Sequence, residues 1–323
     1  MKYRRFGRLG WMVSEIGYGM WGMAGWTGSD DEESMRSLQL AVDLGCNFFD
    51  TAWAYGDGHS EKLLGRLVKA NSGTKIYTAT KIPPKNLQWP SRREHTLEDC
   101  YPSEHIEDYI HRSLDNAGLE CFDCVQFHTW EDEWLKDMRW ANKMTELKSQ
   151  GLFKSAGISI NRWEPWNGIE TVKSGLIDAV QVIYNIFDQN PEDELFHACQ
   201  EMQVAVIARV PFDEGTLTGS LTKKSRWPQG DWRNTYFVPE NLIPSVERAD
   251  KLKEILPEEM TMPEMALRFI LNNRDVSTII PGMRKPGHVE SNMATSDAGP
   301  LAEDLHKLLR AHRWDREPTD WSQ

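Results

Sequence analysis

Short apolar runs alternate with amphipathic stretches along almost the whole of this 323-residue chain, and the alternation limits the folds that it can adopt. A parallel sheet produces such a pattern, because each buried strand is followed by a helix that returns the chain to the same edge of the sheet. The expected strands cover residues 15–18, 47–50, 76–81, 124–128, 153–158, 179–183, 204–209 and 278–281. The expected helices cover residues 31–44, 61–68, 103–116, 133–150, 163–172, 191–202, 244–256 and 263–272.

Eight strand–helix units without a break in composition predict one closed (β/α)8 barrel, a TIM barrel, as a single domain over residues 1–323. Residues 1–14 are expected to form a β-hairpin across the barrel floor, and residues 301–312 an extra C-terminal helix. Long loops at residues 20–30, 82–102 and 210–241 follow three of the expected strands. Because loops after strand ends form the active face of such a barrel, we expect the functional site there.

The charge balance excludes several classes of partner. The formal net charge is -12, whereas nucleic-acid binders and proteins of anionic membrane surfaces carry a basic footprint. The N-terminus has no apolar signal-peptide core, and no run approaches the roughly 18 apolar residues of a membrane span. We therefore expect a cytoplasmic protein. Its five cysteines include Cys121 and Cys124 at C-x-x-C spacing, but no second pair completes a zinc site, so packing thiols are the expectation.

Four polar residues stand at or just after successive expected strand ends: Asp50, Tyr55, Lys81 and His128. The ordinary pKa of a tyrosine, near ~10, is too high for an efficient proton donor at neutral pH. A neighbouring ammonium would lower the pKa, so Lys81 is expected to tune Tyr55, with Asp50 holding Lys81 charged. His128 can donate a hydrogen bond to a substrate oxygen. Together the four residues predict a general acid at a carbonyl oxygen.

Other chemistries fit these residues less well. A metal site is disfavoured, because His128 is the one good nitrogen ligand of the four and Lys81 would repel a cation. A serine nucleophile is disfavoured because no G-x-S-x-G elbow occurs in the chain. A barrel isomerase or lyase with a Schiff base at Lys81 is a further alternative, and the pairing of Asp50 with Tyr55 argues against it.

Half of the 14 tryptophans fall in loops on the predicted barrel mouth. One interpretation is ordinary packing of amphipathic rings in long loops, and the other is an aromatic pocket for a sugar ring or an apolar aldehyde. We favour the pocket. Its expected substrate-contacting members are Trp21, Trp26, Trp53, Trp89 and Trp130.

The segment from Asp50 to Gly65, with the pattern Asp-Thr-Ala-x-x-Tyr-Gly followed by Ser60 and Glu61, resembles the aldo-keto reductase superfamily together with Lys81 and His128. The resemblance extends over nearly the whole chain. It implies hydride transfer from a reduced nicotinamide to a carbonyl carbon, with Tyr55 as the proton donor. By the same resemblance, residues along the strand ends would hold the cofactor: Gly19, Met20, Trp21, Ser159, Gln181, Arg209, Val210, Pro211, Phe212, Gly215, Gly219, Gly282, Met283, Arg284, His288 and Asn292.

Cofactor choice is expected to depend on Arg284 and Lys285, which precede Pro286 at the last crossover. Arginine binds phosphate in a bidentate manner and a helix N-terminus favours anions, so the pair favours NADP(H) over NAD(H). The chain departs from the family pattern at Arg209, where many members have an aromatic residue that stacks on the nicotinamide. Further departures are Ile160 after Ser159, with Asn161 as a candidate substitute, and Gly282 and Ser291 near the last strand.

The sequence thus predicts an NADP(H)-dependent oxidoreductase that reduces an aldehyde or ketone, with a sugar or sugar derivative among the candidates. The alternative is a redox-sensing or regulatory barrel that binds the dinucleotide and turns over poorly, similar to potassium-channel β-subunits. The complete set of Asp50, Tyr55, Lys81 and His128 favours the enzyme. The identity of the small carbonyl substrate and the oligomeric state are left open.

Overall fold

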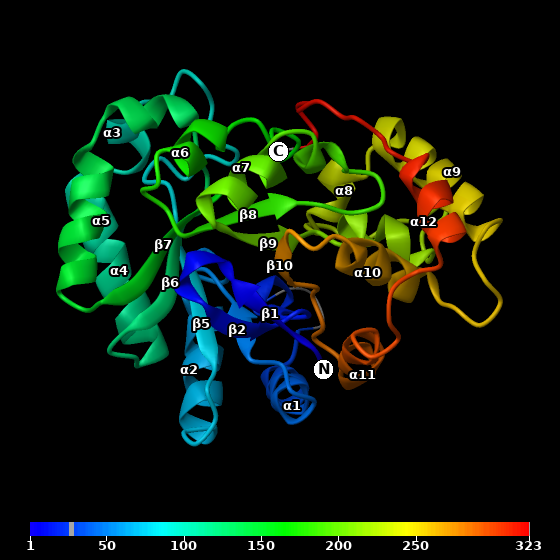
Figure 1. The fold of residues 1–323 in the computed structure, drawn as a ribbon, viewed down its shortest axis with the longest axis horizontal. Coiled ribbons are helices and arrows are strands. Elements are labelled where there is room, and N and C mark those ends of the chain that lie inside the picture. The colour runs from blue at the N-terminus through cyan, green and yellow to red at the C-terminus, as the bar shows by residue number, and fades with distance from the viewer. Residues whose placement is uncertain (26–28, 323) are drawn as a thin grey trace.

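The computed structural model describes residues 1–25 and 29–322, and at its centre eight parallel strands form a barrel (Figure 1). Each strand pairs with its neighbour in sequence order, because every crossover helix returns the chain to the adjacent position. The strands are β3 (Tyr18–Gly19), β4 (Phe48–Asp50), β5 (Tyr77–Ile82), β6 (Phe122–Phe127), β7 (Phe153–Ser159), β8 (Ala179–Ile183), β9 (Ala205–Arg209) and β10 (Val276–Ile279). The predicted barrel is confirmed, although its first strand is shorter and lies later than expected.

The barrel closes along a seam between its first and last strands. Gly17 N–H donates to the Ile279 carbonyl at 2.7 Å, and Gly19 N–H donates to the Pro281 carbonyl at 3.0 Å. A Cβ atom on Gly19 would lie 2.6 Å from the Ile280 carbonyl oxygen, so a side chain here would force the two strands apart. Close backbone approach at this glycine therefore allows closure.

An antiparallel hairpin of β1 (Tyr3–Phe6) and β2 (Trp11–Ser14) covers the barrel floor, as the sequence predicts. Figure 1 shows it in blue in front of the barrel strands. Phe6 and Val13 are fully buried and pack with Phe48 and other inward-facing side chains of the barrel interior. The hairpin therefore closes the apolar interior at the N-terminal ends of the strands.

Helices surround the barrel and cover the outer faces of its strands (Figure 1). Their ends follow capping rules: the Asp30 carboxylate accepts the Glu33 N–H at α1, and the Thr261 hydroxyl accepts the Glu264 N–H at α10. The helices are α1 (Asp31–Asp43), α2 (His59–Ala70), α3 (Leu97–Cys100), α4 (Ser103–Ala117), α5 (Arg139–Ser149), α6 (Ile169–Lys173), α7 (Leu195–Met202), α8 (Arg233–Tyr236), α9 (Pro239–Lys253), α10 (Met262–Asn272), α11 (Pro286–Ala294) and α12 (Glu303–Arg310). The extra C-terminal helix is α12.

Several helix boundaries differ from the predictions. The continuous helix expected at 133–150 is divided into a 3-10 turn at Asp132–Lys136 and α5, because Asp137 is extended and its carboxylate accepts the Arg139 N–H. Helix α6 begins at Ile169 rather than at 163. Helix α9 begins five residues before the expected Pro244, with Pro239 in its first turn and Pro244 inside it.

The segment after α12 crosses the barrel mouth and supports the loop that follows β9. Arg316 is 7% exposed and pairs with Asp188 and with Asp213, the latter at 2.8 Å. Trp321 packs against Trp163, with ring centroids 5.7 Å apart. The end of the described chain therefore contributes directly to the rim of the mouth.

Candidate active site

An ion pair between Lys81 and Asp50 lies at the centre of the barrel mouth. Asp50 ends β4 and Lys81 lies near the end of β5; their side chains are 2% and 0% exposed, with Lys81 Nζ 2.6 Å from Asp50 Oδ2. Lys81 Nζ also donates to the Thr51 carbonyl at 2.8 Å and to Tyr55 Oη at 3.4 Å. The predicted Asp, Tyr and Lys thus share one hydrogen-bonded cluster, and the ammonium contacts the phenol directly.

The residues after Tyr55 fix the loop that carries it. Thr51 Oγ1 donates to Ser60 Oγ at 2.7 Å, which ties the start of the loop to the first turn of α2. Glu61 is fully buried and accepts hydrogen bonds from Thr80 Oγ1 at 2.6 Å and from Asn116 at 2.9 Å. A Cβ on Gly65 would lie 1.8 Å from a backbone oxygen of α4, so the glycine permits close packing of α2 on α4. The motif residues beyond the cluster are therefore structural supports for Tyr55.

The electrostatics of Tyr55 differ from the sequence-based expectation. Burial raises the pKa of Tyr55 and outweighs the lowering by Lys81, so the net direction is upward rather than downward. Burial also lowers the pKa of Lys81, but Asp50 and Tyr55 outweigh this effect and place it above the ordinary value. At neutral pH the site therefore holds a protonated phenol beside a charged ammonium.

His128 faces the same cluster from the end of β6. Its ring lies edge-on to Tyr55, with centroids 5.6 Å apart, and edge-on to Trp89 at 5.7 Å. Burial, Lys81 and Arg209 place the pKa of His128 well below its ordinary range. Its Nδ1 has no hydrogen-bond partner among residues 1–25 and 29–322. A neutral imidazole of this kind can donate one hydrogen bond to a ligand oxygen beside Tyr55.

Two glutamine amides orient the carboxylate of Asp50. Gln181 Nε2 donates to Asp50 Oδ1 at 2.9 Å, and Gln126 Nε2 donates to the same oxygen at 3.2 Å. Gln181 was expected to hold the cofactor; its side chain lines the cavity, and its amide nitrogen donates to Asp50. Gln126 was not identified from the sequence, although it precedes His128 by two residues on β6 and therefore points to the same face.

A cavity of about 460 Å³ begins at Asp50, Tyr55 and His128 and extends along the mouth to Arg284 and His288. Most of the expected cofactor-binding residues line it: Gly19, Met20, Trp21, Gln181, Arg209, Val210, Pro211, Phe212, Gly215, Gly282, Met283, Arg284 and His288. Three do not line it. Ser159 and Asn292 are buried outside its lining, and Gly219 contacts Met262 behind the loop after β9.

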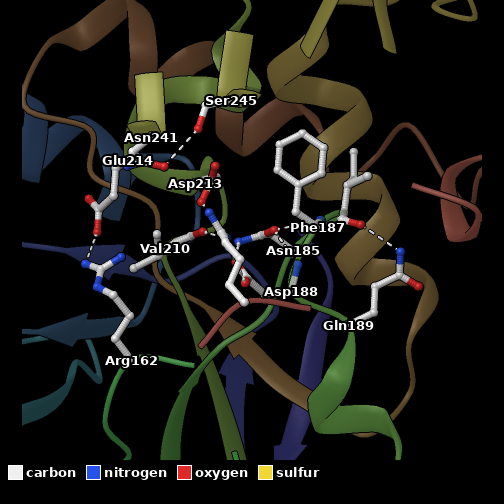
Figure 2. Close-up of polar contacts among 12 residues, drawn as sticks. Arg162, Asn185, Phe187, Asp188, Gln189, Val210, Asp213, Glu214, Asn241 and Ser245 are labelled. Carbon is white, nitrogen blue, oxygen red and sulfur yellow. Dashed lines mark hydrogen bonds and ion pairs between the residues drawn. The ribbon is translucent and has the colours of Figure 1, made fainter. Parts of the chain in front are cut away.

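The loop after β9 has a backbone conformation that few residues adopt. Val210 has a φ of 54° and Gly215 a φ of 109°, and such a value is costly for a β-branched valine. Figure 2 shows Asn185 beneath this loop, where its Nδ2 donates to the Val210 carbonyl at 3.1 Å and to Asp188 at 2.9 Å. Together with Arg316 on Asp213, these contacts hold the loop against the cavity.

The predicted aromatic wall is only partly present. Trp21 lines the cavity and packs on Trp232 at a centroid distance of 5.0 Å. Trp53 packs edge-on against Tyr109 and does not line the cavity. Trp89 does not line the cavity either, but its ring packs edge-on against His128, which does. Trp26 lies outside the described residues.

The prediction that Trp130 contacts the substrate is wrong. It is fully buried, and its Nε1 donates to Thr171 at 2.8 Å. Trp134 and Trp140 pack around it, with centroids 5.5 Å and 5.0 Å away. Trp130 is therefore part of the core and not a wall of the substrate pocket.

Two arginines that line the cavity, Arg162 and Arg233, were not identified from the sequence. Trp232, one of the tryptophans expected at the barrel mouth, and Glu214, within the segment expected along the cofactor, line it as well. Figure 2 shows Arg162, from the loop after β7, reaching Glu214 in the loop after β9, and the two form an ion pair. Arg233 pairs with Asp231. The lining is thus rich in arginine although the chain as a whole is acidic. Such a set of donors fits a polyanionic dinucleotide.

Comparison with known proteins gives a consistent result. An aldo-keto reductase from Schizosaccharomyces pombe whose name specifies NADP(+) is 29% identical over 294 residues, covering 87% of this chain and 83% of that protein. An NADH-specific methylglyoxal reductase from Escherichia coli is 25% identical over 298 residues, covering 87% and 89%. The solved holo form of an aldo-keto reductase from Bacillus halodurans has a TM-score of 0.78 at 24% identity, covering 100% of both chains, which shows the shared fold.

The family model described as "Aldo/keto reductase family" matches residues 15–313. This range includes every strand of the barrel and the Asp50, Tyr55, Lys81 and His128 cluster at its mouth. The chain therefore belongs to the aldo/keto reductase family.

Proposed function

We propose that this protein is an NADP(H)-dependent oxidoreductase that reduces an aldehyde or ketone, with Tyr55 as the proton donor. The observation that carries the proposal is the contact of Tyr55 Oη with Lys81 Nζ at 3.4 Å, in a cavity that arginines also line. A bound reduced nicotinamide would supply the hydride to the carbonyl carbon. Arginine side chains and the strained loop after β9 would hold its phosphates.

The chain's own residues account for the proton. The raised pKa of Tyr55, caused by burial, keeps the phenol protonated and ready to donate to the carbonyl oxygen. Lys81 then stabilises the phenolate that remains, and Asp50 keeps Lys81 in place. Neutral His128 donates a hydrogen bond to the same oxygen and orients the carbonyl.

The preference for NADP(H) rests on the far end of the cavity. Arg284 and His288 line it there, and Arg284 directly precedes the N-cap residue of α11, whose N-terminal end favours an anion. An adenosine 2′-phosphate would meet both features. The name of one relative specifies NADP(+) and the name of the other specifies NADH, so the relatives do not decide the cofactor preference of this chain.

The function is tested by mixing purified protein with NADPH and a panel of aldehydes, ketones and ketoses, and following the loss of the reduced nicotinamide absorbance. We expect turnover with at least one carbonyl class. Tight NADPH binding without turnover for any of them would contradict the enzyme and support the dinucleotide-binding regulatory barrel instead.

A further inference from the structure

Two adjacent carboxylates, Asp213 and Glu214, lie in the loop after β9, the loop that is proposed to hold the cofactor phosphates. Glu214 lines the cavity and pairs with Arg162. Asp213 is buried, but Phe212 before it and Glu214 after it both line the cavity. A carboxylate so close to the cavity wall would repel a phosphate unless a cation neutralises it. The group that neutralises Asp213 therefore matters for the binding of a dinucleotide.

That group comes from the tail after α12, residues 313–322. Arg316 Nη2 donates to Asp213 Oδ1 at 2.8 Å, and Arg316 Nε donates to Asp188 Oδ1 at 3.2 Å. The Arg316 side chain is almost fully buried, and its guanidinium lies 4.5 Å from the centroid of the Trp163 ring. Burial lowers the pKa of Arg316, but Asp188 and Asp213 outweigh this effect and place it well above the ordinary value. The guanidinium is therefore charged at neutral pH.

Arg316 supports the loop at two points. One is its direct pair with Asp213. The other runs through Asp188, because Asn185 Nδ2 donates both to Asp188 Oδ2 at 2.9 Å and to the Val210 carbonyl at 3.1 Å (Figure 2). Val210 and Asp213 have φ values of 54° and 44°, and such a backbone conformation persists only where its surroundings hold it. Arg316 thus contributes to holding two left-handed positions of the loop.

Nothing else in the described structure replaces Arg316 at Asp213. Among residues 1–25 and 29–322 it is the one basic residue within ion-pair distance of Asp213, and Asp213 Oδ2 has no hydrogen-bond partner there. Loss of the guanidinium would leave Asp213 and Asp188 buried without a counter-ion, which is strongly unfavourable. The loop could relieve this only by moving Asp213 toward water, and that movement would change the cavity wall.

We propose that Arg316 is a positioning residue for the dinucleotide: it neutralises Asp213 and holds the loop after β9 in the conformation that binds the cofactor phosphates. The inference rests on the proposed function and adds a determinant of cofactor affinity. Arg316 does not line the cavity, and it lies beyond residues 15–313, the range that the family model matches. Because coupling between two sites is reciprocal, a bound dinucleotide must in turn stabilise the tail that carries Arg316.

A purely structural role for Arg316 is the competing explanation. Such a role would lower the free energy of unfolding when Arg316 is replaced, but it would leave the cofactor affinity of the folded protein unchanged. A positioning role raises the dissociation constant for NADPH in protein that is still folded. It also raises the KM for NADPH while kcat at saturating NADPH stays within about threefold, because Arg316 makes no contact with the Tyr55 and Lys81 cluster.

The first experiment titrates NADPH by fluorescence in the wild-type protein, Arg316→Met, Arg316→Lys and Arg313→Met. Arg313 is the matched control, because it lies on the same tail but pairs with Asp193 and Asp315, neither of which is in the loop after β9. We expect the dissociation constant to rise by about 10- to 100-fold in Arg316→Met, the range of a charged hydrogen bond.

The rise should be smaller in Arg316→Lys, which keeps the charge but cannot bridge two carboxylates in the same way. In Arg313→Met it should be less than about twofold, since exposed ion pairs contribute little. Circular dichroism shows that each variant is folded at the temperature of the titration. An unchanged dissociation constant in folded Arg316→Met would overturn the proposal.

The second experiment adds Asp213→Asn to Arg316→Met. If Arg316 acts by neutralising Asp213, removal of the bare carboxylate should recover part of the lost NADPH affinity, although Asp188 still lacks its partner. A double variant that binds NADPH no better than Arg316→Met would show that Arg316 does not act through Asp213.

The third experiment needs no variant, so it decides the question even if Arg316→Met fails to fold. Hydrogen exchange of residues 313–322 is followed in the wild-type protein with and without NADPH. We expect bound NADPH to slow exchange in this segment, by the reciprocity of coupling. Equal exchange in the two states, in protein that binds NADPH, would overturn the proposal. Absence of any binding of NADPH or NADH to the wild-type protein would instead contradict the proposed function.

Discussion

The two ends of the barrel differ in how completely their buried polar groups are paired. At the floor, the carboxylates Glu15, Asp123 and Asp178 each have at least one basic side chain within ion-pair distance: Arg4 for the first, Lys75 and Lys154 for the second, and Arg8 and Lys148 for the third. At the mouth, His128 and Arg209 keep nitrogen atoms without a partner in the described structure. The three floor carboxylates are paired within the protein, whereas the mouth holds buried nitrogen atoms that the described residues do not pair.

The largest expected effect of a substitution at the mouth is that of Tyr55→Phe. It removes only the proposed proton donor and leaves the ring, so kcat for carbonyl reduction should fall by about 10²- to 10⁴-fold. Steady-state turnover with NADPH measures the loss, and a fluorescence titration of NADPH serves as the control for an intact cavity. Unchanged turnover would exclude Tyr55 as the donor.

Lys81→Met tests a fully buried ion pair at the mouth. Removing Lys81 leaves the carboxylate of Asp50 buried and uncompensated, so we expect a loss of about 3–5 kcal/mol in the free energy of unfolding, measured in urea. Adding Asp50→Asn to Lys81→Met should restore part of the lost free energy of unfolding, because it removes the uncompensated carboxylate. The matched change at the floor is Lys75→Met, because Asp123 keeps Lys154 and the Lys75 side chain is 52% exposed.

For Lys75→Met the expected loss is about 1 kcal/mol or less, with kcat/KM unchanged. An equal loss of stability in Lys75→Met and Lys81→Met would remove the distinction between the two ends of the barrel.

Arg284→Ala addresses the far end of the cavity. If Arg284 meets the adenosine 2′-phosphate, the dissociation constant for NADPH should rise by about 10- to 100-fold while that for NADH changes little. Titration of both cofactors gives the comparison. Equal weakening of NADPH and NADH would contradict a contact with the 2′-phosphate.

The smallest effect concerns pH. Burial holds the pKa of His128 in the folded protein well below the unfolded value of about 6.5, so the unfolded chain binds more protons below that pH. The contribution of His128 to stability is therefore full above pH 6.5 and declines as the pH falls below it. His128→Phe should flatten this part of the profile of unfolding free energy against pH. An identical decline in both proteins would show that other groups are responsible.

Much of the fold and the central cluster could be predicted because their signals are local. A polar residue at the end of a buried strand is visible in the sequence, so Asp50, Lys81 and His128 could be placed at the barrel mouth from the sequence alone. The helix boundary at Asp137 could not be predicted, because the apolar spacing of a helix continues through this residue and only the extended backbone of Asp137 shows the break. The direction of the pKa shift of Tyr55 depends on how deeply it is buried, which the sequence does not specify.

The remaining misses depend on contacts between distant loops. Arg162 and Glu214 lie on loops after different strands, and each alone reads as a solvated charge. Trp21 and Trp130 both follow strand ends, yet packing places one at the cavity and the other in the core. Pairing and packing of this kind are properties of the assembled barrel.

A ligand bound in the cavity would also contact the seam between β3 and β10. Gly19 and Met20 on one side of the seam and Gly282 and Met283 on the other all line the cavity, so a molecule bound there would touch both ends of the rolled sheet. These strands come from opposite ends of the sequence, so bringing them together requires the closure of a long stretch of chain, which slows folding. A dinucleotide at a hundred times its dissociation constant would add about 2.7 kcal/mol to the closed barrel alone. The dinucleotide would hold the first and last strands together, and the protein would have a lower free energy of unfolding in cells that lack it.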